Sequence, residues 1–284
     1  MHLKAFHSYF LNELRPFYGE HEASAITGMV FEDLLHANRS RIIMQPKQTV
    51  DENEVTKMME ALEQLKTYKP VQYILGTAWF YKLPFKVTDA VLIPRPETEE
   101  LVQQAVQFLQ ASGNKQVLDI GTGSGCIPVS IKKNIPGAIV TGIDISNAAL
   151  AIAEENAHRH HATITWMQLD FLDESKWKEL RMFDVITSNP PYIPENEREK
   201  LDKNVTAYEP GLALFVADKE PLVFYKKIAD FGKNHLAADG KIFMETHEDY
   251  ADAVAGHFTL EGYETEVRKD FYGKERMVMA THSP

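Results

Sequence analysis

The most chemically specific segment of the sequence is Asn189-Pro190-Pro191-Tyr192, which directly follows the predicted strand 183–188. The two prolines restrict φ and lack N–H donors, so they hold the chain in a stiff, extended corner. In that corner the side-chain oxygen of Asn189 and the carbonyl of Pro190 can both accept hydrogen bonds from one substrate NH₂ group. The ring of Tyr192 can stack on a planar group beside them.

An amide or aryl amine is a poor nucleophile because its lone pair is delocalised into the π-system. Two acceptors that hold its N–H bonds raise the electron density on nitrogen and orient it toward an electrophilic carbon. Catalysis of this kind depends on positioning and electrostatics and needs no covalent intermediate. The sequence therefore predicts transfer of a group to a planar nitrogen. Asn189, Pro190 and Tyr192 are the expected catalytic residues, and Asn189, Pro190, Pro191 and Tyr192 the expected substrate-binding residues.

A second segment with chemical meaning is Gly121-Thr122-Gly123-Ser124-Gly125, which lies between a predicted buried strand and a predicted helix. Glycines at such a turn let backbone N–H groups approach a ligand closely. A dinucleotide fingerprint would require glycine or alanine as its third small residue, at the position of Cys126. The spacing therefore argues against an NAD-dependent oxidoreductase.

The next two predicted strands also end in polar groups that suit a nucleoside. Asp144 follows the glycine segment by about 20 residues, where a carboxylate can accept hydrogen bonds from both ribose hydroxyls. Asp170 and Phe171 suit the edge and the face of an adenine ring. Each feature is common by itself, but three successive strand ends carry the required groups in order.

This set resembles the class I S-adenosylmethionine-dependent methyltransferases. The resemblance implies S-adenosyl-L-methionine as cofactor and S-adenosyl-L-homocysteine as product. Because the sulfonium already activates the methyl group, no metal is expected. The residues expected to bind the cofactor are Gly121, Thr122, Gly123, Ser124, Gly125, Asp144, Asp170, Phe171 and Asn189.

The elements that must position these residues alternate between strand and helix from Lys115 onward. Strands are expected at 116–120, 138–144, 163–170, 183–188, 241–245, 264–268 and 276–280. Such alternation predicts an α/β, Rossmann-like sheet that is mostly parallel, with helices on both faces and ligands at the carboxyl ends of the strands. The last two strands are close in sequence and are expected to form an antiparallel edge pair.

The first 70 residues or so predict a small helical bundle. Apolar side chains recur at helical spacing in three stretches: Phe6, Phe10 and Leu14; Ala25, Ile26, Met29, Val30 and Leu34; and Val55, Met58, Met59, Leu62 and Leu65. Asp51 and Glu54 match a capping box at the start of the third helix.

Between the bundle and the sheet the pattern becomes aromatic and β-branched, which indicates a short hairpin between Tyr68 and Pro94. A further helix is expected to begin near Pro96, with Glu97, Glu99 and Glu100 in its first turn, where the helix dipole favours negative charge. We expect a helical domain at 1–75, a hairpin linker at 76–95 and a methyltransferase domain at 96–284.

Composition and charge limit the partners. The chain has 30 Lys and Arg residues against 41 Asp and Glu residues, a formal net charge of -11. Such a surface gives no general attraction to a phosphate backbone, so we expect no direct nucleic-acid partner. One cysteine excludes an internal disulfide and a Cys-rich zinc site. Without an apolar run of about 18 residues or a signal-like start, a cytoplasmic monomer that does not contact membranes is expected.

Longer stretches carry a more specific resemblance. They are 70–76 (PVQYILG), 92–99 (LIPRPETE), 208–210 (YEP) and 270–273 (DFYG). With the two motifs above, they closely resemble the peptide chain release factor (glutamine-N5) methyltransferases, the PrmC/HemK family. The resemblance implies methylation of the glutamine side-chain amide in the GGQ motif of release factors, which aids translation termination. It also implies that residues 1–75 dock the release factor.

Two positions depart from that family pattern. The chain has Glu245-Thr246-His247 where an apolar residue and glycine usually follow the glutamate, and Tyr208 where phenylalanine is commoner. The pattern does not by itself give a role to Arg95 or Glu97, and the two hypotheses are a hinge and a pocket rim. The alternative hypotheses are a nucleic-acid amino-methyltransferase and a protein that binds the cofactor without turnover.

Overall fold

The computed structural model describes residues 1–113 and 116–283 and divides the chain into two compact units. The helical unit consists of Met1–Thr77 together with Asp202–Tyr208, and the α/β unit contains the rest. Lys115, where the alternation is expected to begin, and position 284, the expected end of the second domain, lie outside the described residues. Among the described residues, no helix is long and apolar enough to cross a membrane.

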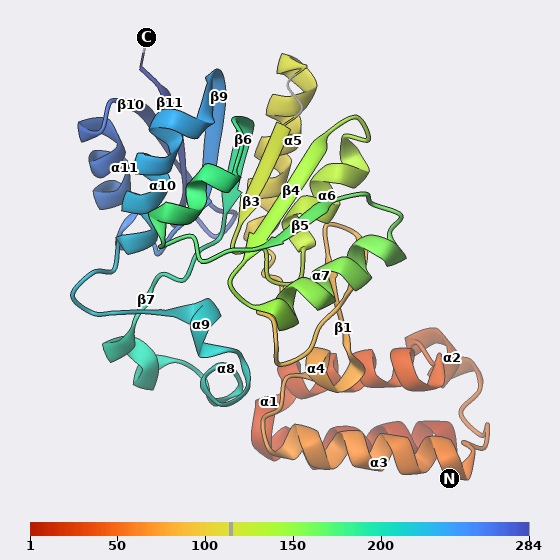
Figure 1. The fold of residues 1–284 in the computed structure, drawn as a ribbon. Coiled ribbons are helices and arrows are strands. Elements are labelled where there is room, and N and C mark those ends of the chain that lie inside the picture. The colour runs from red at the N-terminus through yellow and green to blue at the C-terminus, as the bar shows by residue number, and fades with distance from the viewer. Residues whose placement is uncertain (114–115, 284) are drawn as a thin grey trace. The chain divides into compact units, whose positions relative to one another are not determined.

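The helices of the helical unit are α1 (Leu3–Leu35), α2 (Arg39–Met44), α3 (Glu52–Lys66), α4 (Val71–Leu75) and α8 (Lys203–Tyr208) (Figure 1). The long helix α1 is two helices joined at Gly19, whose φ of 71° and ψ of -178° are not helical. Helix α3 begins as predicted, because Asp51 and Glu54 form a reciprocal capping box. That box satisfies two backbone N–H groups that would otherwise lack helical partners.

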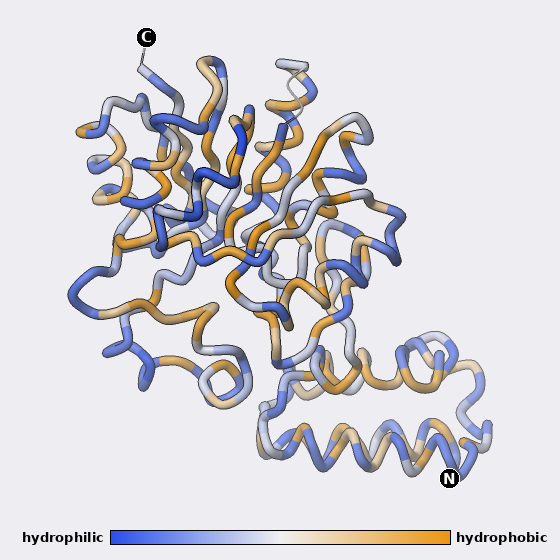
Figure 2. Tube along the Cα trace, in the orientation of Figure 1, coloured by the Kyte–Doolittle hydropathy of each residue, from blue (hydrophilic) through white to orange (hydrophobic). Residues whose placement is uncertain are grey.

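The core of the helical unit differs from the prediction in one helix. Phe6, Phe10 and Leu14 are fully buried as expected. In the second half of α1, however, Ala25 and Met29 are exposed, so the predicted stripe is rotated by about one position. The buried side chains there are Ala23, Ile26, Thr27, Val30, Phe31 and Leu35. The short polar side chain of Thr27 can enter the core because its hydroxyl donates to the carbonyl of Ala23 at 2.7 Å. Figure 2 shows α1 and α3 alternating between apolar and polar residues along their length.

The predicted hairpin is present as β1 (Thr77–Phe80) and β2 (Leu83–Lys86). Phe80 and Phe85 are buried in the core of the α/β unit, so the hairpin is packed within that unit. The apolar run 90–94 forms no strand. Helix α5 (Thr98–Ser112) begins two residues after Pro96, with Glu97 as its N-cap, so only Glu99 and Glu100 lie in the first turn.

Among the described residues, seven strands form the central sheet, in the order β10-β11-β9-β6-β3-β4-β5 (Figure 1). Their bounds are β3 (Gln116–Ile120), β4 (Ile139–Asp144), β5 (Thr165–Gln168), β6 (Phe183–Ser188), β9 (Leu236–Glu245), β10 (Tyr263–Lys269) and β11 (Glu275–His282). Strands β3, β4, β5, β6 and β9 pair in parallel, and β11 pairs antiparallel to both β9 and β10. The predicted fold class and the antiparallel pair at one edge are confirmed.

Strands β5 and β9 differ most in length from the prediction. Strand β5 is shorter because it lies at the edge and pairs only with β4, over four positions. Strand β9 is longer because its first residue, Leu236, also pairs with Phe183 of β6, whereas the later part from Ile242 to Met244 pairs with both β6 and β11.

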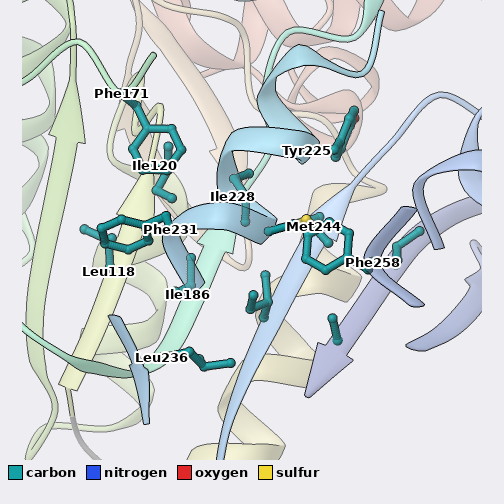
Figure 3. Packing of buried hydrophobic residues seen from close by; sticks show 14 of the residues in the cluster. Leu118, Ile120, Phe171, Ile186, Tyr225, Ile228, Phe231, Leu236, Met244 and Phe258 are labelled. Carbon is teal, nitrogen blue, oxygen red and sulfur yellow. The ribbon is translucent and has the colours of Figure 1, made fainter. Parts of the chain in front are cut away.

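The remaining elements connect and cover the sheet. They are α6 (Cys126–Asn134), α7 (Asn147–Arg159), η1 (Glu174–Glu179), β7 (Ile193–Pro194), η2 (Glu195–Lys200), α9 (Gly211–Leu214), β8 (Phe215–Val216), α10 (Val223–His235) and α11 (Ala251–Leu260). Alternate strand residues enter two separate cores, as the pleat requires. Leu118 and Met244 belong to the core beneath α10 and α11 (Figure 3), whereas Val117 and Phe243 belong to the core beneath α5 and α6.

Candidate active site

A cavity of about 290 Å³ in the α/β unit adjoins the carboxyl ends of β3, β4 and β6. The chain adds β4 and β5 on one side of β3 and then returns to add β6 on the other side. A crevice forms at such a reversal because the connections leave in opposite directions. The predicted site residues that line this cavity are Gly121, Thr122, Gly123, Ser124, Asp144, Asp170, Phe171, Asn189 and Pro191.

The glycine segment turns sharply after β3. The backbone N–H groups of Gly121 and Thr122 both donate to the carbonyl of Ile143 at 3.0 Å, which ties the turn to the neighbouring strand β4. A Cβ built on Gly121 or Gly123 would meet no atom within 4 Å, and both residues have positive φ. Two lining positions therefore leave open space where a side chain would stand, as a ligand cradle requires.

Gly125 has a different place from the other glycines and is not among the described residues that line the cavity. A Cβ there would lie 3.0 Å from the Cβ of Ala153 in α7. Gly125 is also the N-cap of helix α6, where its φ is 77°. Gly125 thus permits close helix packing behind the cavity, and its expected cofactor contact stays a prediction.

Asp144 lies at the end of β4 and is bound to the glycine segment. Its Oδ2 accepts from the N–H of Gly123 at 2.9 Å, and its Oδ1 accepts from the N–H of Ser146 at 2.9 Å. Burial raises the pKa of this carboxyl group, and hydrogen bonds from the backbone partly oppose that rise. Each carboxylate oxygen has two lone pairs, so the group retains capacity to accept from a diol.

The predicted adenine residues both line the cavity but differ in burial. Asp170 is exposed, and its Oδ1 accepts from the N–H of Leu172 at 3.0 Å. Phe171 is 4% exposed and stacks on Trp177, with ring centroids 5.4 Å apart. Its ring also meets Phe231 edge to face. Phe171 is therefore held rigidly by the core beneath α10 (Figure 3).

The residues of the NPPY segment (Asn189–Tyr192) lie at three depths. Asn189 and Pro191 line the cavity, while Pro190 is buried and Tyr192 is partly buried behind the lining. Asn189 Nδ2 donates to Thr98 Oγ1 at 3.1 Å. The hydroxyl of Tyr192 donates to Glu245 Oε1 at 3.2 Å, and burial raises the pKa of this phenol well above its ordinary value. The predicted stacking role of Tyr192 stays a prediction.

Thr98 and Glu245 contact the NPPY segment, although neither was predicted as a site residue. Thr98 is the first residue of α5, and Glu245 is the last residue of β9, next to the strand that leads to Asn189. Both side chains are buried, and Thr98 Oγ1 donates to Glu245 Oε2 at 2.5 Å. The available signals were the LIPRPETE run, which contains Thr98, and the family glutamate at Glu245, which directly precedes the departure at Thr246-His247.

Arg95, in the same LIPRPETE run, forms an ion pair with Glu209. Its guanidinium lies 2.7 Å from Oε1 of Glu209, a carboxylate whose side chain is 2% exposed. The other oxygen of Glu209 accepts from the N–H of Ile93 at 3.2 Å. Because Arg95 lines the cavity, this ion pair fixes one wall of the site.

Both departures from the family pattern, Tyr208 and Thr246-His247, contact identifiable residues. The extra hydroxyl of Tyr208 donates to the carbonyl of Thr67 at 2.9 Å and is 2.8 Å from its side-chain oxygen, within the helical unit. The ring of His247 lies 6.1 Å from the ring of Tyr192, between centroids. The departure at Thr246-His247 therefore adjoins the NPPY segment directly.

Three histidines, His158, His160 and His161, lie at or just beyond the end of α7, and in the part of the chain that the structure describes they are not grouped as metal ligands. His160 is buried, and its Nε2 is 2.8 Å from the carbonyl oxygen of Pro84. Across residues 1–113 and 116–283, no group of three or more His, Cys, Asp or Glu side chains is arranged to hold a metal ion.

Comparisons with known proteins identify the class of the protein. The model of the methyltransferase small domain matches residues 98–207, and the model of the PrmC N-terminal domain matches residues 12–76. The hMettl16 catalytic domain, solved in complex with the MAT2A 3'UTR hairpin 6, aligns with a TM-score of 0.55 over 82% of this chain and 83% of that chain. At 12% identity this likeness concerns the fold alone. Fold and site together define an enzyme of the methyltransferase class.

Two relatives specify the family within that class. The release factor glutamine methyltransferase of Flavobacterium psychrophilum is 37% identical, with 98% of each chain covered. That of Bacteroides thetaiotaomicron is 36% identical over 96% of this chain and 98% of the relative. The chain belongs to the release factor glutamine methyltransferase family.

Proposed function

We propose that this enzyme transfers a methyl group from S-adenosyl-L-methionine to the side-chain amide nitrogen of the glutamine in the GGQ motif of peptide chain release factors. The observation that carries the proposal is that Asn189 lines the same cavity as the glycine segment and Asp144. One cavity thus combines groups suited to a nucleoside cofactor with an acceptor suited to an amide NH₂. Family membership supplies the substrate class.

The residues present suit the cofactor. Open space beside Gly121 and Gly123 can admit a ligand close to the backbone, and Asp144 can accept from ribose hydroxyls. Asp170 and Phe171 line the same cavity at the end of the next strand. When bound, the cofactor would supply a methyl group already activated by its sulfonium, so the reaction requires no metal.

The chain's own contribution to the reaction is to hold the acceptor nitrogen. Asn189 accepts from one N–H of the substrate amide through Oδ1, and the Pro190 carbonyl accepts from the other. These contacts align the nitrogen lone pair with the methyl carbon and favour the positive charge that develops on nitrogen. Partial burial of the site keeps water from competing for the same acceptors.

We further propose that the helical unit docks the release factor, in line with the match of its residues 12–76 to the PrmC N-terminal domain. A nucleic-acid acceptor is the alternative substrate class. It is disfavoured by the net charge of -11, because binding to phosphates requires an excess of Lys and Arg at the surface.

The test is transfer of labelled methyl from S-adenosylmethionine to four acceptors in parallel. These are a release factor, its variant with the GGQ glutamine changed to alanine, duplex DNA and an RNA hairpin. We expect label on the intact release factor alone. Label on either nucleic acid but not on the release factor would show that the substrate class is wrong, and equal label on the alanine variant would place the methyl group elsewhere.

A further inference from the structure

A continuous set of hydrogen bonds connects the two ends of the NPPY segment through residues outside it. Asn189 Nδ2 donates to Thr98 Oγ1 at 3.1 Å, and Thr98 Oγ1 donates to Glu245 Oε2 at 2.5 Å. The second oxygen of Glu245 accepts from the hydroxyl of Tyr192 at 3.2 Å. The backbone carbonyl of Glu245 is itself held by the buried hydroxyl of Tyr225 at 3.0 Å. One carboxylate therefore contacts Tyr192 directly and Asn189 through a single hydroxyl.

The direction of these bonds determines which way the Asn189 amide faces. A threonine hydroxyl has one proton, and an ionised carboxylate can only accept. Because Thr98 gives its proton to Glu245, its oxygen is left with lone pairs that can only accept from Asn189. An amide rotated by 180° would place Oδ1 of Asn189 against this oxygen, with no proton between them. The relay thus favours the orientation in which Oδ1 is on the side of the amide away from Thr98.

That orientation is the one that amide methylation requires. A substrate NH₂ group needs an acceptor, and the NH₂ group of a reversed Asn189 would oppose it donor to donor. We propose that Thr98 and Glu245 are positioning residues that hold Asn189 with its side-chain oxygen, and not its nitrogen, available to the substrate amide. This inference rests on the proposed function for its substrate, but the relay itself can be tested without one.

The surroundings of Glu245 support its role as an acceptor. Its side chain is 2% exposed, and burial raises the pKa of this carboxyl group. Hydrogen bonds from Thr98 and Tyr192 and the positive charge of Arg276 oppose that rise and favour the carboxylate, whereas Glu97 acts in the other direction. A buried carboxyl group that accepts hydrogen bonds from two hydroxyl groups and feels the charge of a cation can act as a fixed hydrogen-bond acceptor.

The kinetic test compares two substitutions of one side chain. Thr98→Val keeps the shape but removes the hydroxyl, and we expect kcat to fall on the order of 10- to 100-fold, because the acceptor loses its fixed orientation. The dissociation constant for S-adenosylmethionine should change by less than about 3-fold, and Thr98→Ser should restore most of kcat. The matched control is Thr141→Val, which removes the hydroxyl of a buried residue in β4 that does not line the cavity and should leave kcat unchanged. A Val variant with near-normal kcat, or a Ser variant as impaired as Val, would overturn the proposal.

A second measurement needs no substrate and separates this inference from the proposed function. In ¹⁵N-labelled protein, the side-chain amide of Asn189 is identified by its loss in Asn189→Asp. We expect one of its protons to be shifted downfield and to exchange slowly in the wild type and in Thr98→Ser, because it is bonded to Oγ1. If both protons exchange freely in the wild type, the relay does not exist. Wild type that shows the bonded proton but fails to methylate release factors would refute the proposed function and leave the relay standing.

Discussion

Oδ2 of Asp144 accepts a hydrogen bond from the backbone N–H of Gly123 at 2.9 Å. The bond joins the end of β4 to the turn after β3, two strands that pair in parallel from Gln116 to Ile120. The carboxylate that would bind the ribose thus also positions the turn that would receive the rest of the cofactor. Loss of this group should therefore affect binding through two routes, a lost ligand contact and a less ordered turn.

For Asp144→Ala we expect the dissociation constant for S-adenosylmethionine to rise about 10- to 100-fold, since hydrogen bonds to a charged group contribute roughly 1.5–3 kcal/mol. Titration calorimetry gives the constant directly. Asp173→Ala is the matched control, because Asp173 is exposed and its carboxylate accepts from Ser175 in its own turn. Unchanged affinity in the Asp144 variant would refute the ribose assignment.

For Asn189→Ala we expect kcat to fall by at least about 100-fold, the scale seen when one preorganised group at a reacting centre is removed. The melting temperature should change little, because Asn189 is only partly buried. Release-factor methylation and thermal unfolding measure the two effects. Asn196→Ala, an exposed asparagine in the following 3₁₀-helix, is the control. Near-normal turnover in the Asn189 variant would be incompatible with the amide-holding role.

Asp119 should make stability depend on pH. Burial raises its pKa to about 7, although hydroxyl groups of Thr187 and Thr122 favour the charged form. A folded pKa above the unfolded value means that the folded state prefers the protonated acid. Asp119 therefore does not lower the free energy of unfolding below about pH 4. It lowers that free energy increasingly as the pH rises toward 7, and by a constant amount above that pH. Asp119→Asn removes this dependence.

The measurement for Asp119 is urea unfolding of the wild type and of Asp119→Asn at several pH values. Relative to the wild type, the variant should gain a few kcal/mol of unfolding free energy between pH 4 and pH 7.5, because each pKa unit corresponds to about 1.4 kcal/mol. Any loss from altered packing is the same at every pH and does not change this slope. A difference that does not vary with pH would show that Asp119 ionises normally.

The ion pair of Arg95 with Glu209 should be important for stability. Arg95→Ala would leave a carboxylate that is 2% exposed without its cation, and we expect a loss of about 2–4 kcal/mol in unfolding free energy. Lys200→Ala breaks an exposed pair with Glu197 and should cost less than about 1 kcal/mol. Denaturant unfolding measures both, and equal effects would argue against a special role for the buried pair.

Local sequence patterns were sufficient to predict the strands of the sheet and the groups at their ends. Strands β3 and β6 match the predicted bounds, because apolar runs bounded by turn residues are short-range signals. The glycine segment directly follows β3 and Asp144 is the last residue of β4, so the parallel sheet brings them together. Prediction failed where the local signal was ambiguous, as in the second half of α1, where Met29 is apolar yet exposed.

Only the tertiary structure revealed the contacts that support Asn189. Thr98 precedes it by 91 positions, and Glu209 follows Arg95 by 114. Nothing in the spacing of those residues predicts that they meet. Their proximity depends on which strand lies next to which, on the register of Ser188 with Met244, and on where α5 packs. The sequence by itself therefore determined the elements and the chemical groups of the site, whereas the order of the sheet decided which buried partners orient them.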